Sequence, residues 1–357
     1  MPSVPSSHSS TEHLSFPRPA DSQTVRKQYL SEWSKWAENA APGENRELAF
    51  IRLKLCLENN ESHLDLSALN LTYLPLLPEH IMSLKIDNNA LTSLPRLPYS
   101  LEKIEASFNQ LTTLPALPES LTVLSVSGNH LTMLPELPSP HEYIAVRRNQ
   151  ITMLPALPSL LQVLRAGSNR LSVLPKLPSS LKEIYVSGNH LSELPELPAS
   201  LKNLNISYNR LSALPELPAS LENLNVCHNH ISVLPGLPES LEYLNVHDNH
   251  LTTLPSLPTL LELVDANRNR PESLPDFPAG HRSGARVYWF NHNRITTVPE
   301  NILSLCPEST VIISDNPLSS RTRQTLLQQT TRVNYHGSPD PLFHERRAAA
   351  YACPFAP

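Results

Sequence analysis

Apolar residues recur along this chain with a period of 20 residues, from about residue 61 to about residue 278. Each block follows the pattern Leu-x-x-Leu-x-Val-x-x-Asn-x-Leu-x-x-Leu-Pro-x-Leu-Pro-x-x. Near copies begin at residues 101, 121, 161, 181, 201, 221 and 241. A strict period of this length is typical of a solenoid, in which each unit packs only on its neighbours. The pattern therefore favours recognition of a macromolecule over chemistry in a pocket.

Within each block the spacing predicts one short strand and one extended return. Positions 3–7 predict a parallel strand whose residues at positions 4 and 6 face the core, as Leu204 and Ile206 do. The Leu-Pro-x-Leu-Pro segment predicts a return without a helix, because proline restricts its own φ and the residue before it. Since strands lie about 4.8 Å apart, a dozen units give a gently curved sheet on the order of 60 Å long.

The asparagine at position 9 of the block predicts a structural ladder. Its side chain carries both donors and an acceptor, and it can therefore pair with turn amides and carbonyls that would otherwise be buried without partners. We assign this ladder no functional role. It comprises Asn89, Asn109, Asn129, Asn149, Asn169, Asn189, Asn209, Asn229, Asn249, Asn269, Asn293 and Asn316, and Leu69 stands at this position in the first block.

Two helices are predicted before the repeats, separated by a break at Ala41-Pro42-Gly43. Each has apolar residues at spacings of three or four, so we expect a helical hairpin that covers the first repeat. The first stripe contains Val25, Tyr29, Trp33 and Trp36. The second helix has a broad apolar face, with Leu48, Ile51 and Leu55 on one stripe and Phe50, Leu53 and Leu57 beside it. The predicted fold class is an α/β repeat protein: a leucine-rich-repeat solenoid with a parallel concave sheet, an extended convex side and an N-terminal helical-hairpin cap.

The chain divides into five predicted segments. Residues 1–22 are rich in Ser, Pro and His, lack the apolar core of a Sec-type signal peptide, and predict a disordered leader. Residues 23–60 form the helical cap and residues 61–318 the repeats, although Pro271 and an extended unit weaken the period near its end. Residues 319–336 predict a C-terminal cap helix, and residues 337–357 a disordered tail.

Composition excludes several classes of partner. The net charge of −5, with 17% charged residues, provides no basic surface for nucleic acid or an anionic membrane. No run of 18 apolar residues exists, so no membrane span is predicted. The four cysteines are widely separated, and we expect free thiols in a reducing compartment. Oligomeric state is left open.

A cluster of histidines raises the alternative of a metal site. Adjacent blocks carry Cys227, His228, His230, His247, Asp248 and His250, residue types that bind zinc. Position 10, however, is polar and exposed in most blocks, as His130 and Arg170 illustrate, so the histidines at this position are typical of the repeat surface. We predict neither a metal nor a cofactor, and a continuous repeat sheet offers no pocket for a catalytic triad.

The candidate partner-binding residues lie at strand positions 3, 5 and 7 and beside them, on the predicted concave face. The central blocks are rich in Arg and Tyr, which contribute most of the binding energy in many protein interfaces. The candidates are Tyr143, Arg147, Arg148, Arg165, Tyr185, Tyr208, Tyr243 and Trp289.

Three stretches resemble the type III-secreted leucine-rich-repeat effectors of enterobacterial pathogens. This family includes the invasion plasmid antigen H and Salmonella-type novel E3 ubiquitin ligases, and Yersinia outer protein M. The first stretch is Ser31-Glu32-Trp33-Ser34-Lys35-Trp36 with Ala41-Pro42-Gly43-Glu44, and the second is the 20-residue repeat. The third is Ile313-Ser314-Asp315-Asn316-Pro317-Leu318-Ser319-Ser320, which continues to Asn334-Tyr335-His336-Gly337. Together they cover about residues 23–337.

The resemblance implies type III secretion and action in the host cytoplasm, with the host nucleus as an alternative compartment. It also implies that the repeat arm binds a host protein. Ligase members carry a following helical domain with a catalytic cysteine in a Cys-x-Asp setting, and no cysteine here has Asp two positions later. We therefore expect no catalysis by this chain, either as a frameshifted remnant or as a natural effector without that domain. The alternative is a ligase-family member that is active only with the missing domain.

Overall fold

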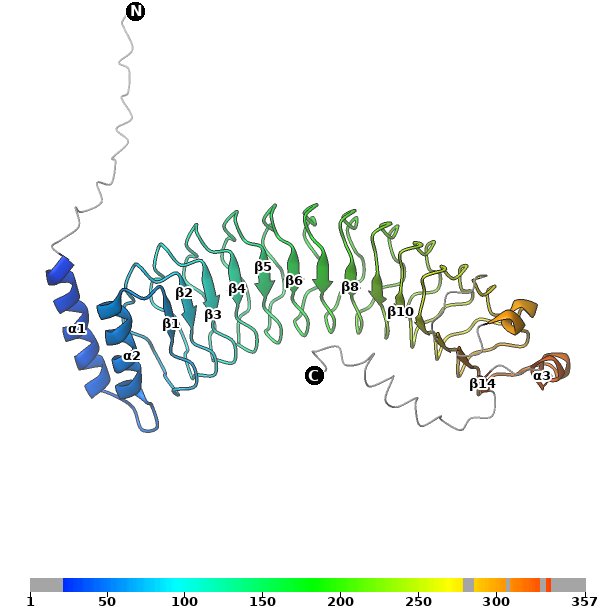
Figure 1. Ribbon diagram of the computed structural model, residues 1–357, viewed down its shortest axis with the longest axis horizontal. Coiled ribbons are helices and arrows are strands. Elements are labelled where there is room, and N and C mark those ends of the chain that lie inside the picture. Colours follow the sequence, from blue (N-terminus) through cyan, green and yellow to red (C-terminus); the bar gives the residue numbers. More distant parts are fainter. Residues whose placement is uncertain (1–21, 279–285, 306–308, 328–331, 335–357) are drawn as a thin grey trace, which may run out of the picture.

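The structure is a computed structural model of the chain, and it describes residues 22–278, 286–305, 309–327 and 332–334. These residues form a gently curved arc of strands, with two helices at one end and a short helix at the other (Figure 1). The described residues form one 14-stranded sheet in sequence order, and every adjacent pair of strands is parallel. The predicted leucine-rich-repeat solenoid is confirmed.

Every strand is three residues long and covers positions 3–5 of its unit. The strands are β1 (His63–Asp65), β2 (Ser83–Lys85), β3 (Lys103–Glu105), β4 (Val123–Ser125), β5 (Tyr143–Ala145), β6 (Val163–Arg165), β7 (Glu183–Tyr185), β8 (Asn203–Asn205), β9 (Asn223–Asn225), β10 (Tyr243–Asn245), β11 (Leu263–Asp265), β12 (Val287–Trp289), β13 (Thr310–Ile312) and β14 (Arg332–Asn334). They are shorter than the predicted positions 3–7. Backbone pairing still continues beyond each strand: the Asn88 amide donates to the Ser107 carbonyl at 2.9 Å.

The core runs the length of the arc as a continuous apolar layer. In the unit that starts at residue 201, Leu201, Leu204, Ile206 and Leu211 are at most 2% exposed, which confirms the predicted inward positions 4 and 6. Burial of one such side chain contributes about 1.5–3 kcal/mol. From β1 to β11 the Pro-rich returns contain neither helix nor strand, as predicted.

The helical hairpin consists of α1 (Ser22–Glu38) and α2 (Arg46–Asn59). Trp33 is fully buried and donates from Nε1 to the Leu76 carbonyl at 2.9 Å, so it joins α1 to the return of the first repeat. The Asn45 side chain caps α2 by accepting from the Leu48 amide at 3.2 Å. Beneath Trp36, the buried Arg46 forms an ion pair with Glu44 at 2.7 Å and donates to the Trp36 carbonyl.

The predicted broad apolar face of the second helix is buried only in part. Ile51 and Leu55 are 45% and 48% exposed, whereas the helix buries Ala49, Leu53, Cys56 and Leu57. This helix has apolar residues on two neighbouring faces, so its periodicity did not decide which face packs against α1 and β1.

The C-terminal units are less regular than the others. Phe277 packs edge-on against Tyr288, with ring centroids 5.1 Å apart, where the other units use aliphatic residues. The 3-10 helix η1 (Glu300–Ser304) occupies a return, and α3 (Ser320–Leu327) follows β13. Within the predicted cap helix of residues 319–336, residues 320–327 are helical, whereas residues 332–334 form the strand β14, which pairs with β13. The predicted tail at residues 337–357, and the leader except for Ser22, lie outside the described residues.

Candidate functional site

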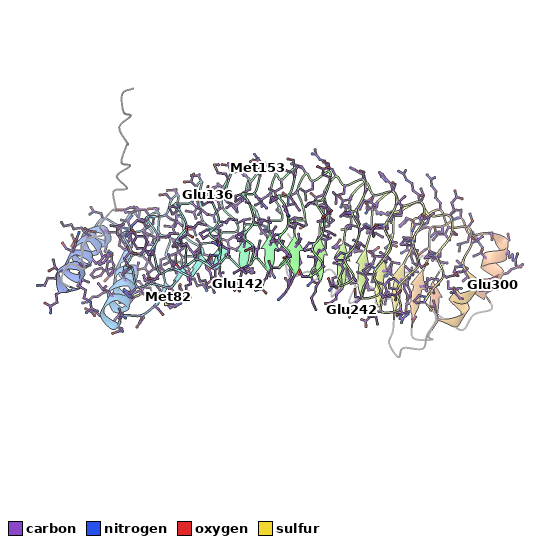
Figure 2. The ribbon with its side chains drawn as sticks, turned by 90° about the horizontal axis from the view of Figure 1, so that it is seen from above. Met82, Glu136, Glu142, Met153, Glu242 and Glu300 are labelled. Atoms are coloured by element: carbon purple, nitrogen blue, oxygen red, sulfur yellow. The ribbon has the colours of Figure 1, made fainter. Side chains whose placement is uncertain are left out.

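The side chains at positions 3 and 5 of the strands form the concave surface. Register places equivalent positions side by side: Ala145 pairs with Arg165, Arg165 with Tyr185, and Tyr185 with Asn205. In most units these side chains are half-buried, while position 4 between them is buried. Figure 2 shows position 2 residues, such as Glu142 and Glu242, along one long edge of the arc, and Met153 from a return along the opposite edge.

Four residues from β5, β6 and β7 form a central cluster: Tyr143, Arg165, Glu183 and Tyr185. The guanidinium carbon of Arg165 lies 5.5 Å from the ring centroid of Tyr143 and 5.2 Å from that of Tyr185. Its Nη2 lies 3.6 Å from the Glu183 carboxylate. A guanidinium between two aromatic rings and a carboxylate is already held in one orientation. Its side chain therefore has little conformational entropy left to lose on contact with another molecule. The structure thus brings together three of the residues predicted from the sequence.

Glu183 was not among the predicted residues. Its strand position 3 in the unit after Arg165 could have indicated it, because positions 3 and 5 share one face and long side chains reach diagonal neighbours on the adjacent strand. Two further predicted residues lie close by in sequence: Arg147 is half-buried and Arg148 is exposed, in the left-handed conformation with φ of 52°. The centre of the concave surface therefore carries an excess of positive charge.

A second group of titratable side chains lies on β11 and in the turns that follow β8, β9 and β10. The Tyr208 ring stacks on His228 with centroids 4.2 Å apart, and His228 Nδ1 lies 2.8 Å from the Asp248 carboxylate. His247 Nδ1 lies 3.6 Å from the Asp265 carboxylate. Burial lowers the pKa of His228, although Asp248 opposes this shift. The described residues contain no group of three or more His, Cys, Asp or Glu side chains that could hold a metal ion.

Two other predicted residues differ in exposure. Tyr243 is half-buried, and its hydroxyl lies 3.4 Å from the Asn245 side-chain amide. Trp289 is only 2% exposed, in a small apolar cluster with Val287 and Ile312 against Leu263. The expectation that Trp289 presents an exposed ring on the concave face is therefore wrong in this structure, because three neighbouring apolar side chains pack with it.

The twelve position 9 asparagines make one repeated set of hydrogen bonds. Asn169 accepts from the Ile151 amide at 3.0 Å and donates to the carbonyls of Val146 and Ala166 at 2.9 and 3.1 Å. Asn293 differs: it accepts from the Asn269 amide at 2.7 Å. The usual donor is the residue at position 11, which here is Pro271 and has no amide hydrogen.

The described cysteines are poor nucleophiles. Burial raises the pKa of Cys56 to about 11 and that of Cys227 to about 12. Both thiols are therefore protonated at neutral pH, and a thiolate is the form that attacks an ester or thioester. Cys306 and Cys353 lie outside the described residues. No helix in the described part of the chain is long and apolar enough to cross a membrane.

Comparison with known proteins identifies a family model, solved structures and curated proteins that this chain resembles. A family model described as type III secretion system leucine rich repeat protein matches residues 3–51. The chain is 33% identical to the solved structure of YopM, a leucine-rich effector protein from Yersinia pestis, with a TM-score of 0.66. That alignment covers 87% of this chain and 99% of the YopM chain.

Curated relatives align over shorter segments. The E3 ubiquitin-protein ligase ipaH7.8 of Shigella flexneri is 44% identical over 89 residues, which is 25% of this chain and 15% of the relative. The outer membrane protein YopM of Yersinia pestis is 40% identical over 78 residues, which is 21% of this chain and 19% of the relative. The matched segments thus span less than a fifth of each curated relative.

Proposed function

Because this chain belongs to the family of type III-secreted leucine-rich-repeat effectors, we propose that it acts in the host cytoplasm by holding a host protein on its concave face. A solenoid of this kind presents a long, continuous surface, which is suited to binding another macromolecule. Neither the family match nor the relatives' names favour the host nucleus, and we do not propose it.

The central cluster is the observation that carries this proposal. Arg165 lies between Tyr143 and Tyr185 and beside Glu183, yet the register of the sheet needs none of these side chains. Half-buried Arg and Tyr residues that are already ordered lose little entropy on binding, and these residue types dominate the energetic centres of interfaces. The cluster is therefore better suited to contact with a protein than to support of the fold.

A charge-reversal pair tests the proposal. Arg147→Glu combined with Arg165→Glu should abolish capture of the host protein from host cytosol by the immobilised full chain, with an unchanged melting temperature. The matched control, Arg170→Glu with Arg210→Glu, reverses the same charge at two exposed residues at position 10. The control should capture the same protein as the wild type. Equal capture by the test pair and the wild type, quantified by mass spectrometry, would contradict the proposal.

A second candidate function is recognition of the substrate of an E3 ubiquitin ligase. It is favoured by the match to the protein named E3 ubiquitin-protein ligase ipaH7.8. On this proposal the concave face selects the protein to be modified, and this chain contributes no catalytic cysteine. Incubation with ubiquitin, activating enzyme and conjugating enzyme should give no thiol-labile ubiquitin adduct on the chain. An adduct that is lost in one of the four Cys→Ser variants would show that the chain itself is catalytic.

A further inference from the structure

Position 8 of the repeat has a backbone conformation that most side chains avoid. From Ala68 to Asp315 the non-glycine residues at this position have φ between 52° and 57°, and Gly128 and Gly188 have φ of 65° and 64°. Glycine adopts this left-handed region freely and Asn and Asp adopt it at low cost, whereas bulky side chains are unfavourable there. Phe108 and Tyr208 nevertheless occupy it.

Both aromatic rings are exposed but held in place. Phe108 is 54% exposed and Tyr208 is 58% exposed. The Phe108 ring lies against Gly128, where an added Cβ would come within 2.8 Å of the ring. The Tyr208 ring stacks on His228 at an interplanar angle of 19°. Each ring therefore occupies a backbone conformation that is unfavourable for a bulky side chain and exposes apolar surface, neither of which helps the chain to fold.

The position 8 column is continuous with the concave face. His228 lies edge-on to His247, with ring centroids 5.2 Å apart, and His247 contacts Asp265 on β11. In the four units between Phe108 and Tyr208, the only charged residues at positions 7 and 8 are Arg147 and Arg148. The exposed Arg148 therefore places a positive charge between two exposed rings.

We propose that Phe108, Arg148 and Tyr208 form an anchoring line for an extended segment of the host partner, an inference that rests on the proposed function. Phe108 and Arg148 are two units apart, and Arg148 and Tyr208 are three units apart. At about 4.8 Å per unit these separations are about 10 and 14 Å, which match about three and four residues of an extended chain at about 3.4 Å each. The segment carries an acidic residue between two apolar residues.

Phage-displayed random 12-residue peptides, selected on the immobilised full chain, test this inference. We expect enrichment of peptides that carry an acidic residue between two apolar residues. Phe108→Asn and Tyr208→Asn should each weaken binding of the best synthetic peptide by about tenfold or more, because each removes an aromatic anchor. Neither substitution should lower the melting temperature, because Asn tolerates the left-handed conformation. Arg148→Glu should shift selection toward a basic central residue.

His292→Asn is the matched control, because His292 is an exposed ring at position 8 outside the anchoring line. It should leave peptide affinity unchanged. The inference is overturned if no peptide is enriched, or if the enriched peptides bind the Phe108 and Tyr208 variants as tightly as the wild type. The two proposals fail separately. Host capture that is lost in the Arg147→Glu and Arg165→Glu pair but retained in both aromatic variants overturns only the anchoring line. Host capture that survives the pair overturns the proposed function.

Discussion

At the scale of single residues, the repeat accommodates some departures by a change of hydrogen-bond partner. The Asn ladder shows this at Pro271, where Asn293 takes a different amide as its donor. His141 is a departure without such compensation. It stands at position 1, where neighbouring units have Leu121 and Leu161, and it is fully buried. Its Nδ1 lies 3.0 Å from the Pro138 carbonyl, while its Nε2 has no hydrogen-bond partner in the described part of the chain.

His141→Leu should stabilise the protein, and more so in acid. Burial lowers the pKa of His141 in the folded state, so the unfolded chain binds a proton first as the pH falls through about 6.5. Stability is therefore lost below that pH and is retained above it. We expect a gain of about 1–3 kcal/mol at pH 7.5, because an unpaired buried nitrogen is removed, and a larger gain at pH 5.5.

Thermal unfolding at the two pH values measures both effects. His190→Leu, at an exposed position 10, is the control and should change neither the stability nor its pH dependence. An equal gain for His141→Leu at both pH values would mean that His141 does not contribute to acid sensitivity.

At the scale of elements, the hairpin of α1 and α2 covers the open apolar end of the sheet. Trp33 is the main link, because its indole is buried and donates to the return of the first repeat. The same elements show what apolar periodicity does not decide, because α2 has apolar residues on two neighbouring faces. Its packing against α1 and β1 buries Leu53 and Leu57 and leaves Ile51 and Leu55 exposed.

Trp33→Ala should destabilise the first repeats locally. A cavity of this size costs about 3–5 kcal/mol, and in a solenoid each unit contacts only its neighbours. Amide hydrogen exchange should therefore accelerate in β1 and β2 and stay unchanged in β9 and β10. Val25→Ala, at a 36% exposed site on the same helix, should leave all four strands unchanged. Uniform acceleration along the sheet would show that the molecule unfolds as one cooperative unit.

At the scale of the whole molecule, the repeat units have the same length, so one complete unit can be deleted without a change in the pattern of the others. Deletion of residues 161–180 removes one 20-residue unit and joins two equivalent positions, so the sheet should keep its register and the chain should remain folded. The deletion also removes Arg165 and should abolish capture of the host protein. Deletion of residues 81–100, which contain none of the candidate residues, should retain capture.

Circular dichroism and capture from host cytosol measure the two consequences of each deletion. Loss of the folded signal in both deletions would contradict the modular solenoid. Capture that persists without residues 161–180 would place the partner elsewhere on the arc.

Much of this architecture follows from the repeat pattern. Leu204 and Ile206 could be placed in the core because every unit puts the same residue types in the same backbone environment. The Asn positions and the extended Pro-rich returns follow for the same reason. The aromatic packing of Tyr288 with Phe277 did not follow, because this unit departs from the period.

The remaining features depend on contacts between side chains that are 20 or more residues apart. Tyr143, Arg165, Glu183 and Tyr185 meet only because parallel register places three successive strands side by side. Trp289 is buried by residues of other strands, and position 8 is left-handed at every unit whatever its side chain. A periodic sequence specifies which residues face inward, since that depends on local geometry. Which exposed side chains meet is specified by the spacing and curvature of the assembled sheet.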